Sequence, residues 1–258
     1  MDFIQEPPEL GNQFEDDAVL KNYLRRQLDD SDYDSESDRL AELGRLAGED
    51  LYELQMSTLD EEASLQRWSP WGERIDNIEH TRVWQEAESV AREYRLVGSG
   101  YDEHPSARIR QFARVYLFGP STDTYTCPLA MTDGAARTIL ASGKDALIED
   151  VVPHLIGESE DPWTSGQWMT ETAGGSDVST NNTTARETED GWELHGRKWF
   201  TSAIDSEVAL ALAKPESSDE LTLFYVKARD DQGRPRNFRV TRLKDKIGTR
   251  ELRSEERR

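Results

Sequence analysis

The spacing of apolar residues changes once along this chain, near residue 166, and that change limits the folds it can adopt. Before it, apolar side chains recur every three or four residues, as on one face of a helix. After it, they alternate with polar or small residues at a period of two, as in strands. Helices followed by strands predict an α+β protein. We expect a helical N-terminal domain over residues 1–163 and a β-domain over residues 164–258.

The clearest helical stripe runs from Leu40 to Leu54, and Ser35 or Ser37 is a candidate for its N-terminal cap. A second stripe predicts a helix over residues 81–97 that ends at Gly98. Looser stripes predict further helices, near residues 14–24, 106–118, 128–141 and 144–155.

The strand-rich part begins with a hairpin signal, Asp190-Gly191, followed by alternation over residues 192–195. Leu221–Val226 is almost continuously apolar and predicts a buried strand. Alternation at residues 208–212 and 238–242 predicts two further strands.

Charge and composition exclude several classes of function. The 258 residues hold 52 acidic and 31 basic side chains, a net charge of −21 that opposes binding to DNA phosphates. We expect adaptation to high salt, where self-repulsion is screened. No apolar stretch long enough to span a membrane and no secretory signal is visible, so a cytoplasmic location is expected. The single Cys127 and the four scattered histidines predict no metal site.

Two segments carry a pattern with chemical meaning: residues 167–178, Gln-Trp-Met-Thr-Glu-Thr-Ala-Gly-Gly-Ser-Asp-Val, and residues 196–202, Gly-Arg-Lys-Trp-Phe-Thr-Ser. Glycines in a loop expose backbone N–H groups that can hold an anion such as a pyrophosphate. The nearby aromatic side chains offer flat faces for a ring system. The alternative, for either segment alone, is an ordinary glycine turn beside core aromatics.

Together these segments resemble the acyl-CoA dehydrogenase family. The first matches its M-T-E-x-x-x-G-S-D flavin loop, the second its K-W-F/I-T/S strand, and residues 242–250 look like a later family segment. The double glycine, Lys198-Trp199-Phe200 and the Leu-Lys-Asp-Lys run resemble the alkylation-response, AidB-like branch, as does the segment over residues 127–132.

The resemblance implies noncovalently bound FAD and the α,β-dehydrogenation of an acyl-CoA thioester. It also implies a β-barrel as the middle domain. By resemblance, Thr170 bonds the polar edge of the flavin ring, and Ser176 lies where flavin and acyl-CoA meet. The implied cofactor-binding residues are Gln167, Trp168, Met169, Thr170, Gly175, Ser176, Trp199, Phe200 and Thr201. An electron-transfer flavoprotein and assembly into a homo-oligomer are further partners that the family suggests.

The family's catalytic base is a Glu on a C-terminal helical domain that this sequence does not reach, so we assign no catalytic residue. Glu171 belongs to the loop motif, and we expect a structural role for it. Lys244 and Lys246 are expected in ion pairs. We expect an incomplete barrel that binds flavin weakly alone and needs a partner supplying the missing half. The alternatives are a flavoprotein with a DNA-protection role, or a noncatalytic remnant or one half of a split enzyme.

Overall fold

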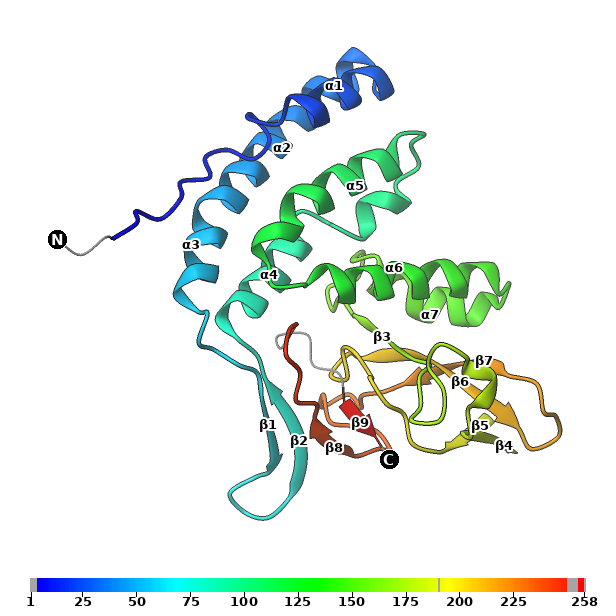
Figure 1. Ribbon diagram of the computed structural model, residues 1–258. Coiled ribbons are helices and arrows are strands. Elements are labelled where there is room, and N and C mark those ends of the chain that lie inside the picture. Colours follow the sequence, from blue (N-terminus) through cyan, green and yellow to red (C-terminus); the bar gives the residue numbers. More distant parts are fainter. Residues whose placement is uncertain (1–3, 190, 250–254, 258) are drawn as a thin grey trace. The chain divides into compact units, whose positions relative to one another are not determined.

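A computed structural model describes residues 4–189, 191–249 and 255–257 of the chain (Figure 1). Asp190, Arg250 and most of the tail that follows Arg250 lie outside the described residues. The chain forms two compact units, Met1–Glu61 with Arg82–Thr126, and Glu62–Thr81 with Cys127–Arg258. The first is helical and the second is built around a sheet, so the expected α+β class is confirmed.

The first unit contains the helices predicted before residue 120, with one break that the sequence did not predict. The stripe from Leu40 to Leu54 falls on two helices because the backbone at Glu49 leaves the helical region. Asp29 caps the first of them by accepting a hydrogen bond from the Asp32 N–H at 2.8 Å, so the proposed serine caps are wrong. The helices of this unit are α1 (Ala18–Gln27), α2 (Asp30–Gly48), α3 (Asp50–Ser57), α4 (Arg82–Glu93) and α5 (Ala107–Phe118).

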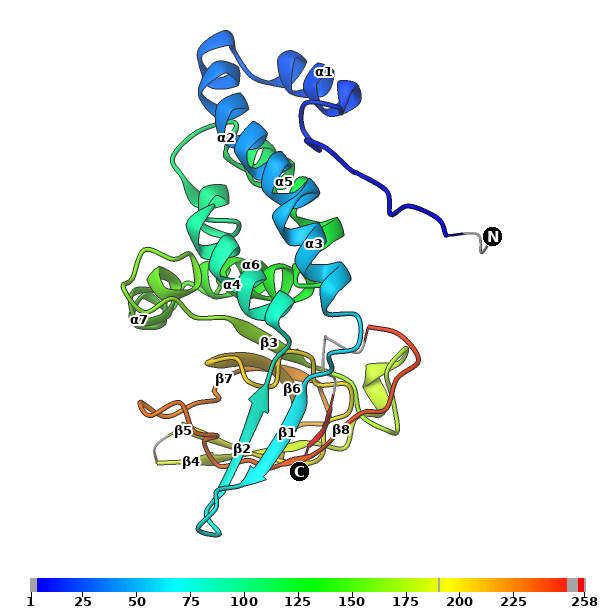
Figure 2. The same cartoon turned by 90° about the vertical axis from the view of Figure 1, so that its left-hand side faces the viewer.

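Helices α2 and α5 pack side by side, and a buried ion pair joins them (Figures 1 and 2). Arg114 donates to both carboxylate oxygens of Glu36, at 2.6 and 2.7 Å, and also to the Tyr94 carbonyl oxygen. Such a bidentate geometry satisfies both charges inside the apolar core. Gly98 begins a short 3₁₀ helix, Gly98–Tyr101, whereas the sequence predicted only a helix end. None of the described helices is long and apolar enough to cross a membrane.

A β-hairpin interrupts the region that we expected to be wholly helical. Strands β1 (Ser64–Trp68) and β2 (Arg74–Glu79) pair in antiparallel fashion and form a two-stranded ribbon (Figure 2). The turn between them closes through the Ser69 N–H and the Glu73 carbonyl oxygen, at 2.8 Å. Gly72 sits in this turn with φ of +83°, a conformation that favours glycine. The hairpin belongs to the second unit.

The sheet of the second unit is centred on strand β6, which pairs with three other strands. Its neighbours are β3 and β4 in parallel and β7 in antiparallel fashion, and among the described strands β5 pairs with β4 alone. The strands are β3 (Ser165–Trp168), β4 (Thr184–Thr188), β5 (Gly191–His195), β6 (Val208–Pro215) and β7 (Thr222–Lys227). A separate pair is formed by β8 (Val240–Leu243) and β9 (Glu255–Arg257).

The predicted strands lie close to their expected positions, but the burial expected for them is partly wrong. The predicted hairpin is confirmed, since β4 and β5 are antiparallel neighbours. Their pairing begins beside the turn, where Thr188 lies opposite Gly191. Strand β6 is buried on both faces over most of its length, which its alternating leucines and alanines did not indicate. Strand β7, predicted to be buried, is half exposed, and Leu223 keeps 41% of its surface accessible. The reason is its position, because it pairs with β6 on one side only among the described strands.

Trp168 lies at the centre of the core of this unit, and its side chain is 1% exposed. Its ring packs edge-on against Phe238, with centroids 5.8 Å apart. Gly166 makes room for the indole, since a Cβ there would lie 2.6 Å from Trp168 Nε1. Helices α6 (Thr126–Ala141) and α7 (Asp145–Leu155) belong to this unit, and Thr132 Oγ1 accepts from the Ser165 N–H of β3 at 2.9 Å.

Candidate functional site

The structure brings the two motif segments together. The Trp199 N–H donates to the Thr170 carbonyl oxygen at 2.9 Å. Three residues away on each segment, Gln167 and Ser202 form an isolated antiparallel bridge. The loop that follows β3 therefore runs directly beside residues 199–202, although some thirty residues separate them along the chain.

The loop after β3 is held in one tight conformation. Glu171 and Gly174 exchange backbone hydrogen bonds at 2.9 and 3.1 Å. Thr180 Oγ1 then donates to the carbonyl oxygens of Ala173 and Asp177, both at 3.0 Å. A Cβ at Gly174 would lie 2.0 Å from Thr180 Oγ1 and 2.3 Å from the Asp177 carbonyl oxygen. The position therefore requires glycine, because the backbone approaches too closely for a side chain.

The tip of this loop is open to solvent. Gly175 and Ser176 are exposed, and within the described part of the chain their N–H groups donate to no other protein group. Consecutive free N–H groups at a glycine-containing turn form a concave donor surface suited to an anion. Gln167 is also exposed, whereas Met169 and Thr170 are half-buried.

Trp199 and Phe200 offer aromatic surface beside the loop. Their rings meet edge to face, with centroids 5.9 Å apart, and Phe200 is 43% exposed. The backbone of Phe200 has φ of +58°, a left-handed conformation that is strained for a bulky residue. Thr201, the next predicted residue, is fully buried.

Lys244 lies over these rings, 4.9 Å from the centroid of Trp199 and 3.1 Å from that of Phe200. An ammonium group above an aromatic face is attracted by the ring quadrupole. The expected ion pair of Lys244 is therefore replaced, among the described residues, by a cation–π contact with the predicted cofactor surface.

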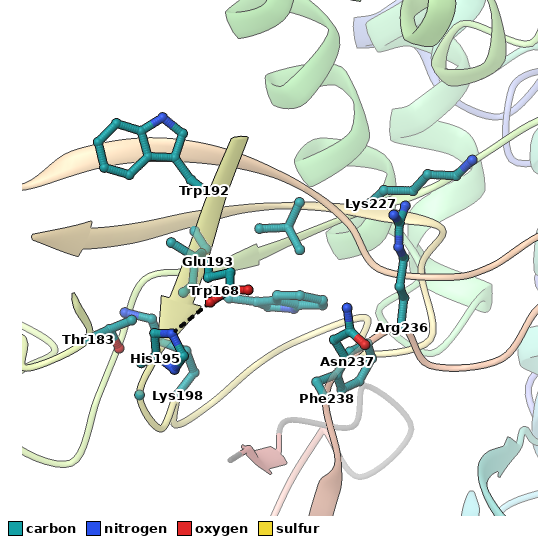
Figure 3. Close-up of a pocket in the computed structure, with 14 residues that line it drawn as sticks. Trp168, Thr183, Trp192, Glu193, His195, Lys198, Lys227, Arg236, Asn237 and Phe238 are labelled. Carbon is teal, nitrogen blue, oxygen red and sulfur yellow. Dashed lines mark ion pairs between the residues drawn. The ribbon is translucent and has the colours of Figure 1, made fainter. Parts of the chain in front are cut away.

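Trp168 is placed differently from its predicted neighbours. Its ring lies in the core and lines a cavity of about 610 Å³ that none of the other predicted cofactor residues borders (Figure 3). Trp192, His195 and Phe238 form part of the same lining. The predicted contact of Trp168 with a flavin ring thus stays a prediction, and its indole is committed to packing.

Glu171 and Lys198 form a buried ion pair behind the loop. Lys198 Nζ lies 2.7 Å from Glu171 Oε1, and the side chains are 7% and 5% exposed. Glu171 also accepts from the N–H groups of Asn182, at 2.7 Å, and Thr183, at 3.1 Å. Burial alone would raise the pKa of Glu171, but the hydrogen bonds from Lys198, Thr183 and Asn182 together lower it. Burial lowers the pKa of Lys198, and Glu171 opposes that shift.

The sequence did not reveal this pair. Glu171 was expected to be structural, and its contacts agree with that role, but its partner was not identified. The available signal was a lysine inside the second motif of a chain with few lysines.

Comparison with known protein families identifies the chain. Residues 5–162 match the model described as adaptive response protein AidB N-terminal domain, and residues 166–258 match that of the acyl-CoA dehydrogenase middle domain. The chain belongs to the acyl-CoA dehydrogenase family, in its AidB-like branch. The two matches meet close to the predicted boundary at 163/164. The division into compact units differs, because it places β1, β2, α6 and α7 with the sheet. That boundary therefore stays a prediction.

Relatives in this family are longer than the chain. It is 36% identical to acyl-CoA dehydrogenase family member 11 of Caenorhabditis elegans, over 97% of this chain and 43% of the relative. It is 30% identical to the putative acyl-CoA dehydrogenase AidB of Escherichia coli K12, over 83% of this chain and 42% of that protein. The chain thus spans less than half the length of these two family members.

Solved structures of family members show the same fold. Bd2924 in its apo form superposes with a TM-score of 0.93 at 37% identity, over 99% of this chain and 54% of that one. Caenorhabditis elegans ACDH-11, in complex with C11-CoA, gives a TM-score of 0.91 at 36% identity, over 99% of this chain and 46% of that one.

The residues present fit the FAD that acyl-CoA dehydrogenases imply. The exposed amides of Gly175 and Ser176 suit a pyrophosphate, and the accessible ring of Phe200 suits a planar group. Next to the loop, Asn181 is 1% exposed, and its side-chain Nδ2 donates to the Met169 carbonyl oxygen. Its Oδ1 atom is buried with no partner among the described residues, which leaves an acceptor at the rear of the site.

Proposed function

We propose that this chain is the flavin-binding part of an FAD-dependent, acyl-CoA dehydrogenase-like oxidoreductase. The observation that carries the proposal is the 2.9 Å hydrogen bond between the Trp199 N–H and the Thr170 carbonyl oxygen. It joins the anion-binding turn and the aromatic pair into one surface. Family membership supports the general activity, and FAD itself and the residues that hold it are part of the proposal.

The predicted residues would divide the contacts with the flavin among them. The N–H groups of Gly175 and Ser176 would hold the pyrophosphate. Thr170 would supply a hydroxyl to the polar edge of the ring, and Phe200, with Trp199, would cover one face of it. Thr201 is buried and would support these two residues from behind. Gln167 and Met169 flank the strand end, and Trp168 supports it from the core. When bound, the flavin would supply the redox chemistry, and the protein would orient it.

The proposed substrate class is an acyl-CoA thioester, with Ser176 at the junction of substrate and flavin. The C11-CoA complex of ACDH-11 supports this class. We assign no catalytic base within this chain. Glu171 is unsuited to that role, because its carboxylate is buried and engaged with Lys198 and Thr183.

The proposal is tested by titrating the purified chain with FAD and, separately, with riboflavin, and following flavin fluorescence. Amide donors to the pyrophosphate should make FAD bind at least about tenfold more tightly, since hydrogen bonds to charged groups contribute about 1.5–3 kcal/mol. A chain that binds neither flavin, or binds the two equally, would refute the proposed loop–pyrophosphate contact.

A further inference from the structure

The ion pair of Glu171 and Lys198 connects four separate segments of the second unit. Glu171 lies in the loop after β3, and its carboxylate accepts hydrogen bonds from Asn182 and Thr183, just before β4. Lys198 lies in the second motif and donates to Glu171 and to the Leu212 carbonyl oxygen of β6, each at 2.7 Å. The pair therefore fixes both motif segments to the two strands beneath them.

The pair adjoins the proposed cofactor surface in sequence and in space. A backbone hydrogen bond joins Trp199 to Thr170. Lys198 directly precedes Trp199, and Glu171 directly follows Thr170. Lys198 Nζ also lies 3.5 Å from the Met169 carbonyl oxygen. A shift at either charged residue is thus transmitted within one peptide unit to the groups proposed to contact the flavin.

Stability alone is a weak reason for such a pair. Placing two charges in a core is costly, and apolar side chains of similar volume often stabilise the same position equally well or better. The directional bonds of the pair give what apolar packing does not, namely a fixed separation between two loops.

We propose that Glu171 and Lys198 are a positioning pair that sets the geometry of the FAD-binding surface without touching the cofactor. The identity of the ligand rests on the function proposed above. The positioning of residues 169–176 against residues 199–201 is independent of that function, and it can be measured without ligand.

The test compares four variants of the chain: Glu171→Gln, Lys198→Met, the double variant, and Asp76→Asn as a matched control. Asp76 is also a buried carboxylate of the second unit with a cationic partner, Arg74, at 2.9 Å. Its hydrogen-bond partners, Arg74 and the Val240 N–H, lie outside both motif segments. For each variant, FAD affinity, thermal stability and amide hydrogen exchange without FAD are measured.

We expect E171Q and K198M to weaken FAD binding by about tenfold or more, the order seen when groups that orient a binding residue are removed. D76N should lose comparable stability but change FAD affinity by less than about twofold, because additive effects are expected for separate sites. The double variant separates the effect of the pair on stability from its effect on FAD binding. It should regain stability as the unpaired charge disappears, while FAD affinity stays low.

Recovery of FAD affinity together with stability in the double variant would overturn the proposal, and so would an equal loss in D76N. If the unaltered chain binds no FAD, the function proposed above fails, and hydrogen exchange decides the present inference. E171Q should then accelerate exchange in residues 169–176 and 199–201 more than D76N does. Equal exchange in the two variants would refute the positioning role.

Discussion

The ammonium group of Lys198 lies 2.7 Å from the carboxylate of Glu171, and both side chains are almost completely buried. This contact joins the two motif segments through residues that are 27 positions apart in the sequence. The stability of the unit should therefore depend on pH and on both members of the pair. It should also depend on the glycines that shape the loop.

The pH dependence of stability should reveal Glu171. Its pKa in the folded state lies below the ordinary value of 4.5, so its contribution is complete above the pKa of the unfolded chain and is lost as pH falls through the folded-state pKa. The stability difference between the unaltered chain and E171Q should be largest near neutrality and shrink in acid. Urea denaturation at several pH values measures this difference. A difference independent of pH would contradict the lowered pKa.

Gly174 should tolerate no side chain. A Cβ there would meet the Asp177 carbonyl oxygen at 2.3 Å, and backbone cannot move aside as a flexible side chain can. Gly174→Ala should cost about 1–3 kcal/mol of unfolding free energy, as overpacking usually does. Gly248→Ala is the control, since open space surrounds that position, and it should change stability by less than about 0.5 kcal/mol. Equal costs at the two sites would show that the loop conformation is wrong.

Trp168 should matter more for folding than any exposed aromatic of the same unit. Trp168→Ala removes a fully buried indole and should cost about 3–5 kcal/mol. Trp192, which is 45% exposed and contacts Phe224, is the matched comparison, and its replacement by Ala should cost about 1 kcal/mol or less. Chemical denaturation gives both values, and a mild effect of W168A would argue against its core position.

The family resemblance grouped two segments that local patterns alone left separate. Residues 167–176 and 199–201 lie side by side, as the motifs implied. The hairpin of β1 and β2 was missed because its strands are only five and six residues long and lie between helical stripes, although its turn carries Pro70 and Gly72. The pairing of Glu171 with Lys198 depends on tertiary contacts, which apolar periodicity does not encode.

Salt should stabilise the chain if its acidity reflects adaptation to high ionic strength. The net charge of −21 creates repulsion that is screened over about 10 Å at 0.1 M salt and about 3 Å at 1 M. We expect the melting temperature to rise between these concentrations of NaCl. An equally concentrated uncharged solute is the control. A melting temperature that stays constant or falls with added NaCl would contradict the adaptation.

The central claim is that the loop over residues 167–176 and the aromatic pair of residues 199 and 200 form an FAD-binding surface, and an FAD titration of two proteins tests it most directly. The first is the unaltered chain, and the second is Phe200→Gly, which removes the ring while suiting the left-handed backbone at that position. Saturable binding that weakens about 2- to 10-fold in F200G, the size expected for one aromatic contact, is the predicted result. No saturable binding, or the same affinity in both proteins, would contradict the claim.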